Sequence, residues 1–285
     1  MSKVTLSRTQ RAQFTLNELR KVIARPATEL SYVDEYQLIV AVILSAQCTD
    51  ARVNVVTPPL FAAFPSFGTL AGAVPEDVFP YIRSITYPNN KSRSLVRMAR
   101  RVQTDFGGRL PRTQQALLTL PGVGRKTAQV VASVAFDDPK ALPVDTHVFR
   151  VANRIGLVRD AVTPLKVERG LKAILPRGSW GEAHHLLILH GRYTCTARNP
   201  QCSSCVVAPA CRYYASVQAL PASLRGLDTT RGAYYCKTRR HYFDHLVQRT
   251  DRAGVTQAAC PRCGSMNVFN TKSGATTRVV RDYRV

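Results

Sequence analysis

Apolar positions follow a helical period in several stretches of the chain. Residues 1–27 are basic and carry apolar side chains spaced for one helix face. Residues 36–46 are apolar almost all round, which predicts a buried central helix. Residues 51–113 alternate short helical pieces with Pro and Gly breaks, and two further helical segments lie within 164–190. No internal repeat or low-complexity tract interrupts the pattern.

Residues 114–132 join two apolar helical patterns through a turn that contains Gly122 and Gly124. Glycine adopts positive φ and lets another backbone come close. The amides of Val123, Gly124 and Arg125 are expected at the start of the second helix. Unpaired N–H groups and the helix dipole favour an anion there, so the turn predicts a phosphate site.

Lys126 follows in the first turn of that predicted helix. The positive end of the helix dipole disfavours a protonated amine, which makes Lys126 a candidate nucleophile. A glycine turn between two core helices, followed by a solvated lysine, explains the same residues. The stretch alone leaves both interpretations open.

Three polar residues elsewhere are ambiguous in the same way. Gln47 follows the buried helix, where it either caps the helix end or faces a ligand. Tyr87 lies in a turn-rich loop, residues 85–91, where it either packs on the surface or wedges between stacked bases. Asp145 precedes a helical pattern, which is the ordinary position of an N-cap. In each case the structural interpretation is favoured without further information.

The chain is strongly basic, because it has 40 Lys and Arg residues against 18 Asp and Glu, a net charge of +22. This imbalance points to a polyanion, nucleic acid before an anionic membrane. No apolar run reaches the roughly 18 residues of a membrane span, and the start lacks a signal-peptide pattern. We therefore expect a cytoplasmic protein whose eight cysteines are metal ligands or buried residues, not disulfides.

Four of these cysteines form a C-x6-C-x2-C-x5-C pattern: Cys195, Cys202, Cys205 and Cys211. Soft sulfur ligands select zinc or iron–sulfur. Structural zinc sites usually use two C-x2-C pairs, whereas here one pair is flanked by single cysteines. The spacing favours one [4Fe–4S] cluster over zinc. Arg198 lies within the loop and is a candidate phosphate contact.

Residues 216–285 look like an appendage with half of a zinc-ribbon signature. The candidate ligands are Cys236, Cys260 and Cys263, with His241 or His245 as the fourth. A decayed ribbon packed on its own small core is the alternative. The segment is rich in Arg and Lys, so it can extend a DNA footprint with or without zinc.

Taken together, the motifs closely resemble the endonuclease III family of the helix-hairpin-helix DNA glycosylase superfamily, over about residues 15–215. Besides the four-cysteine loop, the matching segments are Leu44–Asp50, Leu120–Ala128, Val144–Val151 and Leu189–Cys195. The resemblance implies an all-α enzyme with two helical domains flanking a DNA-binding cleft. Residues 28–140 would form a six-helix domain with the hairpin. Residues 1–27 and 141–215 would form the iron–sulfur domain. Residues 216–285 fall outside the family core, and only their cysteine pattern suggests a zinc-ribbon-like extension.

The resemblance also assigns roles. Lys126 matches the catalytic lysine, Asp145 the catalytic aspartate and Gln47 the residue that fills the gap left by a flipped base. The family usually has Gly-Leu-Tyr-Asn at residues 86–89, so Tyr87 replaces its leucine wedge. This departure puts the substrate range in doubt more than the reaction.

The implied protein is a monomeric, nucleoid-associated glycosylase and abasic-site lyase with a [4Fe–4S] cluster. Its partner is duplex DNA with oxidised pyrimidines or abasic sites. A monofunctional adenine or mismatch glycosylase is the alternative, although such enzymes typically lack the hairpin lysine. A DNA-binding or redox-sensing protein without catalysis is a third class, against which Lys126 and Asp145 together argue.

Overall fold

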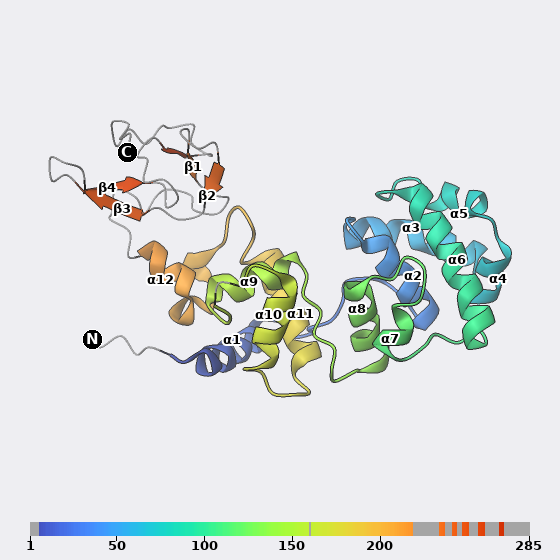
Figure 1. The fold of residues 1–285 in the computed structure, drawn as a ribbon, viewed down its shortest axis with the longest axis horizontal. Helices are drawn as coiled ribbons and strands as arrows, with labels where there is room; N and C mark the ends of the chain where they lie inside the picture. The colour runs from blue at the N-terminus through green and yellow to red at the C-terminus, as the bar shows by residue number, and fades with distance from the viewer. Residues whose placement is uncertain are drawn as a thin grey trace. The chain divides into compact units, whose positions relative to one another are not determined.

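The structure, a computed structural model, describes residues 6–159 and 161–218 and five short strands between residues 234 and 270. Within 6–218 the described residues form helices and contain no strand, which confirms the predicted helical class (Figure 1). None of the described helices is long and apolar enough to cross a membrane.

The chain divides into two compact units. The first, which we call the hairpin unit, comprises Ile23–Phe149 and Ala161–Leu186. The second, the cysteine unit, comprises Met1–Val22, Arg150–Asp160 and Leu187–Val285. The predicted domains, 28–140 and 1–27 with 141–215, stay a prediction. In the division by compactness, residues 23–27, 141–149 and 161–186 belong to the hairpin unit.

The hairpin unit is built around α2, whose residues from Leu38 to Leu44 are all buried. Its apolar sequence leaves no face for water, so α3, α6 and α8 pack on different sides of it (Figure 1). The predicted buried central helix is therefore confirmed. The helices of the unit are α2 Glu35–Ser45, α3 Asp50–Ala63, α4 Phe67–Gly72, α5 Pro75–Ile82, α6 Pro88–Phe106, α7 Gln114–Leu117, α8 Arg125–Phe136 and α10 Pro164–Lys172.

The predicted loop over residues 85–91 is shorter in the structure, because α6 begins at Pro88. Proline fits the first helical position, where its fixed φ is already helical and its missing N–H is not needed. Tyr87 is the N-cap residue, with a left-handed backbone. The loop prediction was wrong for residues 88–91, which form the first turn of the helix.

The cysteine unit begins with α1, Arg8–Val22, which buries Ala12, Leu16 and Leu19 on one face as its periodicity predicts. Arg11 on the same helix donates a hydrogen bond to the Ala210 carbonyl in the cysteine loop. The remaining helices are α12 Arg212–Gln218 and the 3-10 turns η1 Cys202–Ser204 and η2 Ala208–Ala210, while α9 Thr146–Ile155 and α11 Trp180–Tyr193 run through both units.

The C-terminal strands form two antiparallel sheets. One has the order β2-β1-β5, with Cys236 of β1 and His241 of β2 as Cα partners, and the other pairs β3 with β4. The zinc-ribbon form of this segment stays a prediction. The strands are β1 Tyr234–Cys236, β2 His241–Phe243, β3 Val247–Thr250, β4 Thr256–Ala259 and β5 Val268–Asn270.

Candidate active site and cysteine loop

The two glycines of the turn between α7 and α8 differ in conformation. Gly122 has a φ of +80°, and a Cβ there would lie 2.8 Å from Ser94 Cβ. Gly124, the N-cap residue of α8, has an ordinary φ of −88° and open space where a Cβ would stand. Gly122 therefore shapes the turn, and Gly124 leaves room in front of the helix.

The start of α8 offers fewer amides to an anion than the sequence suggests. The Val123 amide donates to the Leu120 carbonyl at 3.1 Å, and the Val123 side chain is buried. The helix has no side-chain N-cap, and the first amides of a helix lack partners within it. The available donors therefore begin after Val123, with Arg125 at the first helical position.

Lys126 is the second residue of α8, and its side chain is exposed. This is the position that the sequence predicts, at a helix start where the dipole is positive. Asp145 lies in the same compact unit. The backbone thus presents the lysine amine beside the glycine turn, on a helix whose other face is packed in the core.

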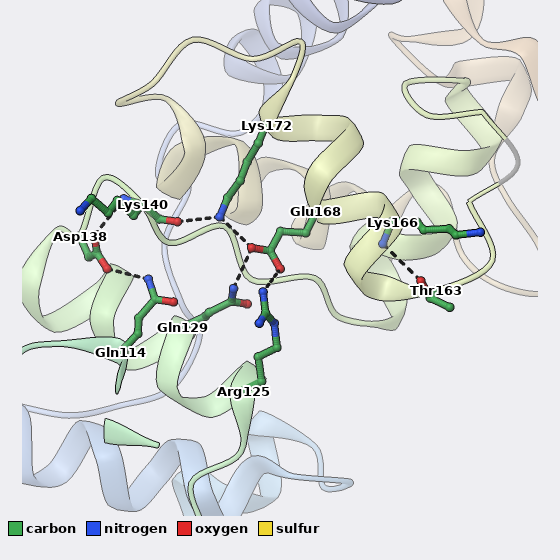
Figure 2. Close-up of polar contacts among 9 residues, drawn as sticks. All are labelled: Gln114, Arg125, Gln129, Asp138, Lys140, Thr163, Lys166, Glu168 and Lys172. Carbon is green, nitrogen blue, oxygen red and sulfur yellow. Dashed lines mark hydrogen bonds and ion pairs between the residues drawn. The ribbon is translucent and has the colours of Figure 1, made fainter. Parts of the chain in front are cut away.

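A buried carboxylate that the sequence analysis missed fixes the side chain next to Lys126. Glu168 of α10 is buried and receives an ion pair from Arg125 (Nη2–Oε2 2.9 Å) and a hydrogen bond from Gln129 (Nε2–Oε1 3.0 Å). Lys172 bridges Glu168 Oε1 and the Lys140 carbonyl, each at 2.7 Å. Figure 2 shows these side chains converging from α8 and α10.

The same contacts set the charge of Glu168 and the direction of Arg125. Burial alone would raise the pKa of Glu168, but hydrogen bonds from Lys172, Arg125 and Gln129 outweigh it and lower the pKa below the ordinary value. The carboxylate therefore stays ionised and holds the Arg125 guanidinium. Because the guanidinium is paired with Glu168, the predicted DNA contact of Arg125 is expected from its backbone amide and not from its side chain. The spacing of Glu168 and Lys172 was visible in the sequence, but the burial of the pair was not.

Asp145 caps α9, as its position predicts. Its Oδ1 accepts the Val148 amide at 2.7 Å, and its carbonyl accepts the Phe149 amide at 2.9 Å. The side chain is half-buried. A carboxylate has two oxygens, so the cap leaves one for other chemistry. The catalytic role of Asp145 stays a prediction.

Gln47 and Tyr87, which the sequence places far apart, lie on neighbouring loops of the hairpin unit. Both are exposed, and both have left-handed backbones, with φ of 56° and 57°. The Thr86 hydroxyl donates to the Gln47 carbonyl at 2.8 Å. Gln47 therefore turns the chain after α2 with its backbone, and its side chain does not act as the helix cap.

The four cysteines of the predicted cluster line one pocket between the end of α11 and the start of α12. The pocket is mostly apolar, with Ile155 and Val207 among its other lining residues. His190 Nε2 lies 3.8 Å from Cys205 Sγ, and burial, with the nearby Arg150 charge, lowers the pKa of His190 to about 4. The imidazole is therefore neutral. The lining thiols are Cys195, Cys202, Cys205 and Cys211.

Two arginines of α9 hold the start of this loop through its carbonyls. Arg154 donates to the Thr196 and Ala197 carbonyls at 2.7 and 3.0 Å, and its Nη1 lies 3.7 Å from Cys195 Sγ. Arg150 donates to the Cys195 carbonyl at 3.1 Å. Arg198, the predicted phosphate contact in the loop, is exposed. The sequence analysis singled out neither of the two α9 arginines.

The four thiols of the pocket are a donor set that fits an iron–sulfur cluster. Burial, reinforced by the neighbouring thiols, raises the pKa of Cys202 and Cys211 to about 11, so thiolates at these two positions need compensating positive charge. Within residues 6–159 and 161–218, no group of three His, Cys, Asp or Glu side chains is placed to hold a metal ion. The four cysteines share one pocket, and four thiolates are the donor set of a [4Fe–4S] cluster.

The candidate zinc ligands of the C-terminal segment are only partly described. Cys236 and His241 stand opposite each other in the β1–β2 ladder. Cys260 and Cys263 lie outside the described residues. The zinc assignment stays a prediction.

A sequence model described as the HhH-GPD superfamily base excision DNA repair protein matches residues 40–177. The chain is 40% identical to endonuclease III of Bacillus subtilis over 200 residues, which are 70% of this chain and 91% of that protein. It is 39% identical to endonuclease III of Escherichia coli K12 over 198 residues, 70% of this chain and 93% of the relative.

Solved structures agree with these relatives. A trapped endonuclease III–DNA covalent intermediate, an estranged-adenine complex, matches with a TM-score of 0.71 and 40% identity over 75% of this chain and 99% of that one. A thermostable thymine-DNA glycosylase shares the fold at a TM-score of 0.64 and 24% identity, covering 72% of this chain and 97% of that one.

Proposed function

The chain belongs to the endonuclease III family, and from this we propose that it is a DNA glycosylase and abasic-site lyase that removes oxidised pyrimidines from duplex DNA. The observation that carries the proposal is Lys126, an exposed amine in the first turn of α8 beside the glycine turn. The 40% identity to a chain trapped covalently on DNA supports an attacking residue in this chain.

DNA binding begins with the backbone around α8. The helix start, uncapped by any side chain, faces a phosphate, and Gly124 lets the strand approach because no Cβ intervenes. These contacts position the duplex and carry no sequence information. The damaged nucleotide then leaves the stack, since its C1′ cannot be reached inside the duplex.

Lys126 performs the covalent chemistry. Its neutral amine attacks C1′, the glycosidic bond breaks, and the base leaves with the bonding electron pair and gains a proton. The Lys126 nitrogen then loses a proton, its lone pair breaks the C1′–O4′ bond, and the ring oxygen takes up a proton, so the opened sugar is held as a Schiff base. This Schiff base makes the 2′ proton acidic. Loss of that proton expels the 3′ phosphate by β-elimination and cuts the strand.

Asp145 assists this step from the start of α9. With Oδ1 held by the Val148 amide, the carboxylate has a fixed orientation. Its negative charge stabilises the positive charge that builds on the sugar, and it accepts a proton from the lysine ammonium. Capping and catalysis are compatible in one residue.

The cysteine loop would hold a [4Fe–4S] cluster through its four cysteines. When bound, the cluster links both ends of the loop and supplies the positive charge that four thiolates require. The loop then presents Arg198 toward DNA phosphates.

Zinc bound by Cys236, His241, Cys260 and Cys263 is a separate proposal. Metal analysis of the full chain, compared with a chain that ends at residue 215, tests it directly. A monomeric state and a nucleoid location also stay predictions.

The test is borohydride trapping on a duplex with one oxidised pyrimidine. We expect a covalent adduct with the wild type and none with Lys126→Gln. An adduct that survives Lys126→Gln, or an active wild type that forms none, overturns the proposed chemistry. Arg109→Gln, an exposed change outside the turn, is the control and should trap normally.

Product analysis before and after alkali separates the proposal from a monofunctional glycosylase. The proposed enzyme cuts the strand without alkali, whereas a monofunctional enzyme leaves it intact until treated. A panel of oxidised, mismatched and undamaged pairs, scored separately for base release and strand cleavage, tests the oxidised-pyrimidine assignment.

A further inference from the structure

Gln47 and Tyr87 share an uncommon backbone conformation. In the described part of the chain, the non-glycine residues with positive φ are Gln47, Tyr87 and Asp137. Asp137 ends α8, whereas the other two lie on different loops and are exposed. Left-handed backbone is unfavourable for glutamine and more so for bulky tyrosine. It persists only where surrounding contacts determine it, and such sites gather at functional positions.

Lys91 supplies contacts to both loops. Its buried ammonium donates to the Leu44 carbonyl at 2.8 Å and the Ala46 carbonyl at 2.6 Å, at the C-terminal end of α2. Its backbone amide donates to the Tyr87 carbonyl at 3.1 Å, which is the ordinary first hydrogen bond of α6. A cation at the negative end of a helix dipole is stabilising. The Lys91 ammonium therefore ties the first turn of α6, which begins directly after Tyr87, to the chain that enters Gln47.

Thr86 joins the loops directly. Its hydroxyl donates to the carbonyl of Gln47 itself at 2.8 Å. The endonuclease III pattern has glycine at this position, which has no hydroxyl to donate. Pro88 follows Tyr87 with a fixed φ and starts α6, so this side of the contact is stiff.

We propose that Thr86 and Lys91 are positioning residues that couple Gln47 and Tyr87 into one rigid two-pronged unit. The unit enters the duplex as a whole, so the side chain that fills the lesion's gap and the aromatic ring that meets the opposite base act in the same step. The proposal rests on the proposed function for the meaning of that step. The coupling itself is a property of the hydrogen bonds.

The coupling makes removal of a base depend on the Thr86 hydroxyl. Valine has the shape of threonine and no donor, so in Thr86→Val the Gln47 turn loses its link to the Tyr87 loop. Loss of one hydrogen bond should slow base release roughly three- to tenfold under single turnover. Thr86→Ser keeps the hydroxyl and should stay within about twofold of wild type. Elimination at a preformed abasic site, which has no base to extract, should change less than base release.

A double-mutant cycle tests whether Thr86 acts through Gln47. Gln47→Ala keeps the carbonyl that accepts the hydrogen bond and removes the side chain that the bond positions. If Thr86 positions that side chain, Thr86→Val should have little further effect in the Gln47→Ala background. Additive effects overturn the proposal. Thr104→Val, the same substitution on an exposed turn of α6, is the matched control and should leave rates and unfolding unchanged.

Fluorescence of 2-aminopurine opposite the lesion reports the step without catalysis. In a Lys126→Gln background, binding should raise the fluorescence as the opposite base unstacks, and adding Thr86→Val should reduce the rise while Thr86→Ser restores it. An unchanged rise, or equal slowing of base release and abasic-site cleavage by Thr86→Val, overturns the coupling. A wild type inactive on both substrates overturns the proposed function instead, and the fluorescence measurement still tests the coupling.

Discussion

The turn before α8 and the cysteine loop both present residues to DNA in our proposal, yet the chain fixes them differently. The turn rests on the core of the hairpin unit, where Leu120 and Val123 are 2% and 7% exposed. The cysteine loop buries few of its own side chains. It is held by Arg150 and Arg154 through backbone carbonyls and by four thiols around a pocket.

The difference predicts opposite sensitivities. In a closely packed segment, the loss of one polar contact should cost little stability, whereas an added side-chain atom that has no room should cost more. A segment that is held by a few long side chains and a metal cluster should lose its structure when a ligand of the cluster, or the cluster itself, is removed. The predictions below test this contrast, beginning with the largest expected effect.

Cys205→Ser should have the largest effect, confined to the cysteine unit. A serine hydroxyl is a poor replacement for a thiolate on iron, so we expect loss of bound iron and of visible absorption. Tryptic cleavage at Arg198 should become faster as the loop loses its link, while the helical circular dichroism of the hairpin unit persists. Iron analysis, absorption and limited proteolysis measure these effects.

Cys48→Ser is the matched control, because Cys48 is a half-buried cysteine of the hairpin unit outside the loop. It should retain full iron. Full iron and unchanged proteolysis in Cys205→Ser would contradict the proposed ligand set.

Gly122→Ala should destabilise the hairpin unit by about 2–4 kcal/mol, because it adds left-handed strain and a Cβ that meets Ser94. Gly124→Ala, with ordinary φ and open space, should cost below about 1 kcal/mol. It should instead weaken DNA binding, since its Cβ enters the space left for a phosphate. Denaturant unfolding and binding titrations separate the two. Equal destabilisation by both substitutions would contradict the different roles assigned to the two glycines.

Local pattern predicted much of the fold and of the candidate site. The apolar run of residues 36–46 became α2, and the glycine turn placed Lys126 at a helix start. Asp145 is the N-cap that its position suggested. These features depend on residues within one or two helical turns of each other, so the sequence contains the information that determines them.

Contacts between distant segments could not be predicted in this way. Thr86 and Gln47 are 39 residues apart, and Arg125 and Glu168 are 43 apart. Nothing near Glu168 in the sequence shows that it is buried against α8. The start of α6 was misplaced for a different reason, because Pro88 favours both a turn and a first helical position.

Glu168→Gln should have a smaller effect than Gly122→Ala, about 1–2 kcal/mol. Breaking a buried ion pair is costly, but the Arg125 side chain is 62% exposed, so water replaces part of what it loses. The single tryptophan supplies a local readout, because Lys172 Nζ lies 4.9 Å from the Trp180 ring centre. A change in Trp180 emission should accompany the loss of stability. Asp105→Asn, which breaks an exposed pair with Arg101, is the control and should change neither.

The smallest effect is the pH dependence that Glu168 gives to the hairpin unit. Its pKa is lowered in the folded chain, because hydrogen bonds from Lys172, Arg125 and Gln129 outweigh the effect of burial. Between the folded pKa and the ordinary glutamate value of about 4.3, the unfolded chain therefore binds a proton that the folded chain does not. The stability from Glu168 is complete above that ordinary value and is lost as pH falls through the folded pKa.

Denaturant unfolding from pH 6 to pH 3, followed by Trp180 emission, tests this dependence. The free energy of unfolding should fall less steeply with decreasing pH in Glu168→Gln than in wild type. Equal slopes would mean that apolar packing, and not this carboxylate, holds α10 against α8. The turn before α8 would then be held by its packed core alone, without a contribution from the ion pair between Glu168 and Arg125.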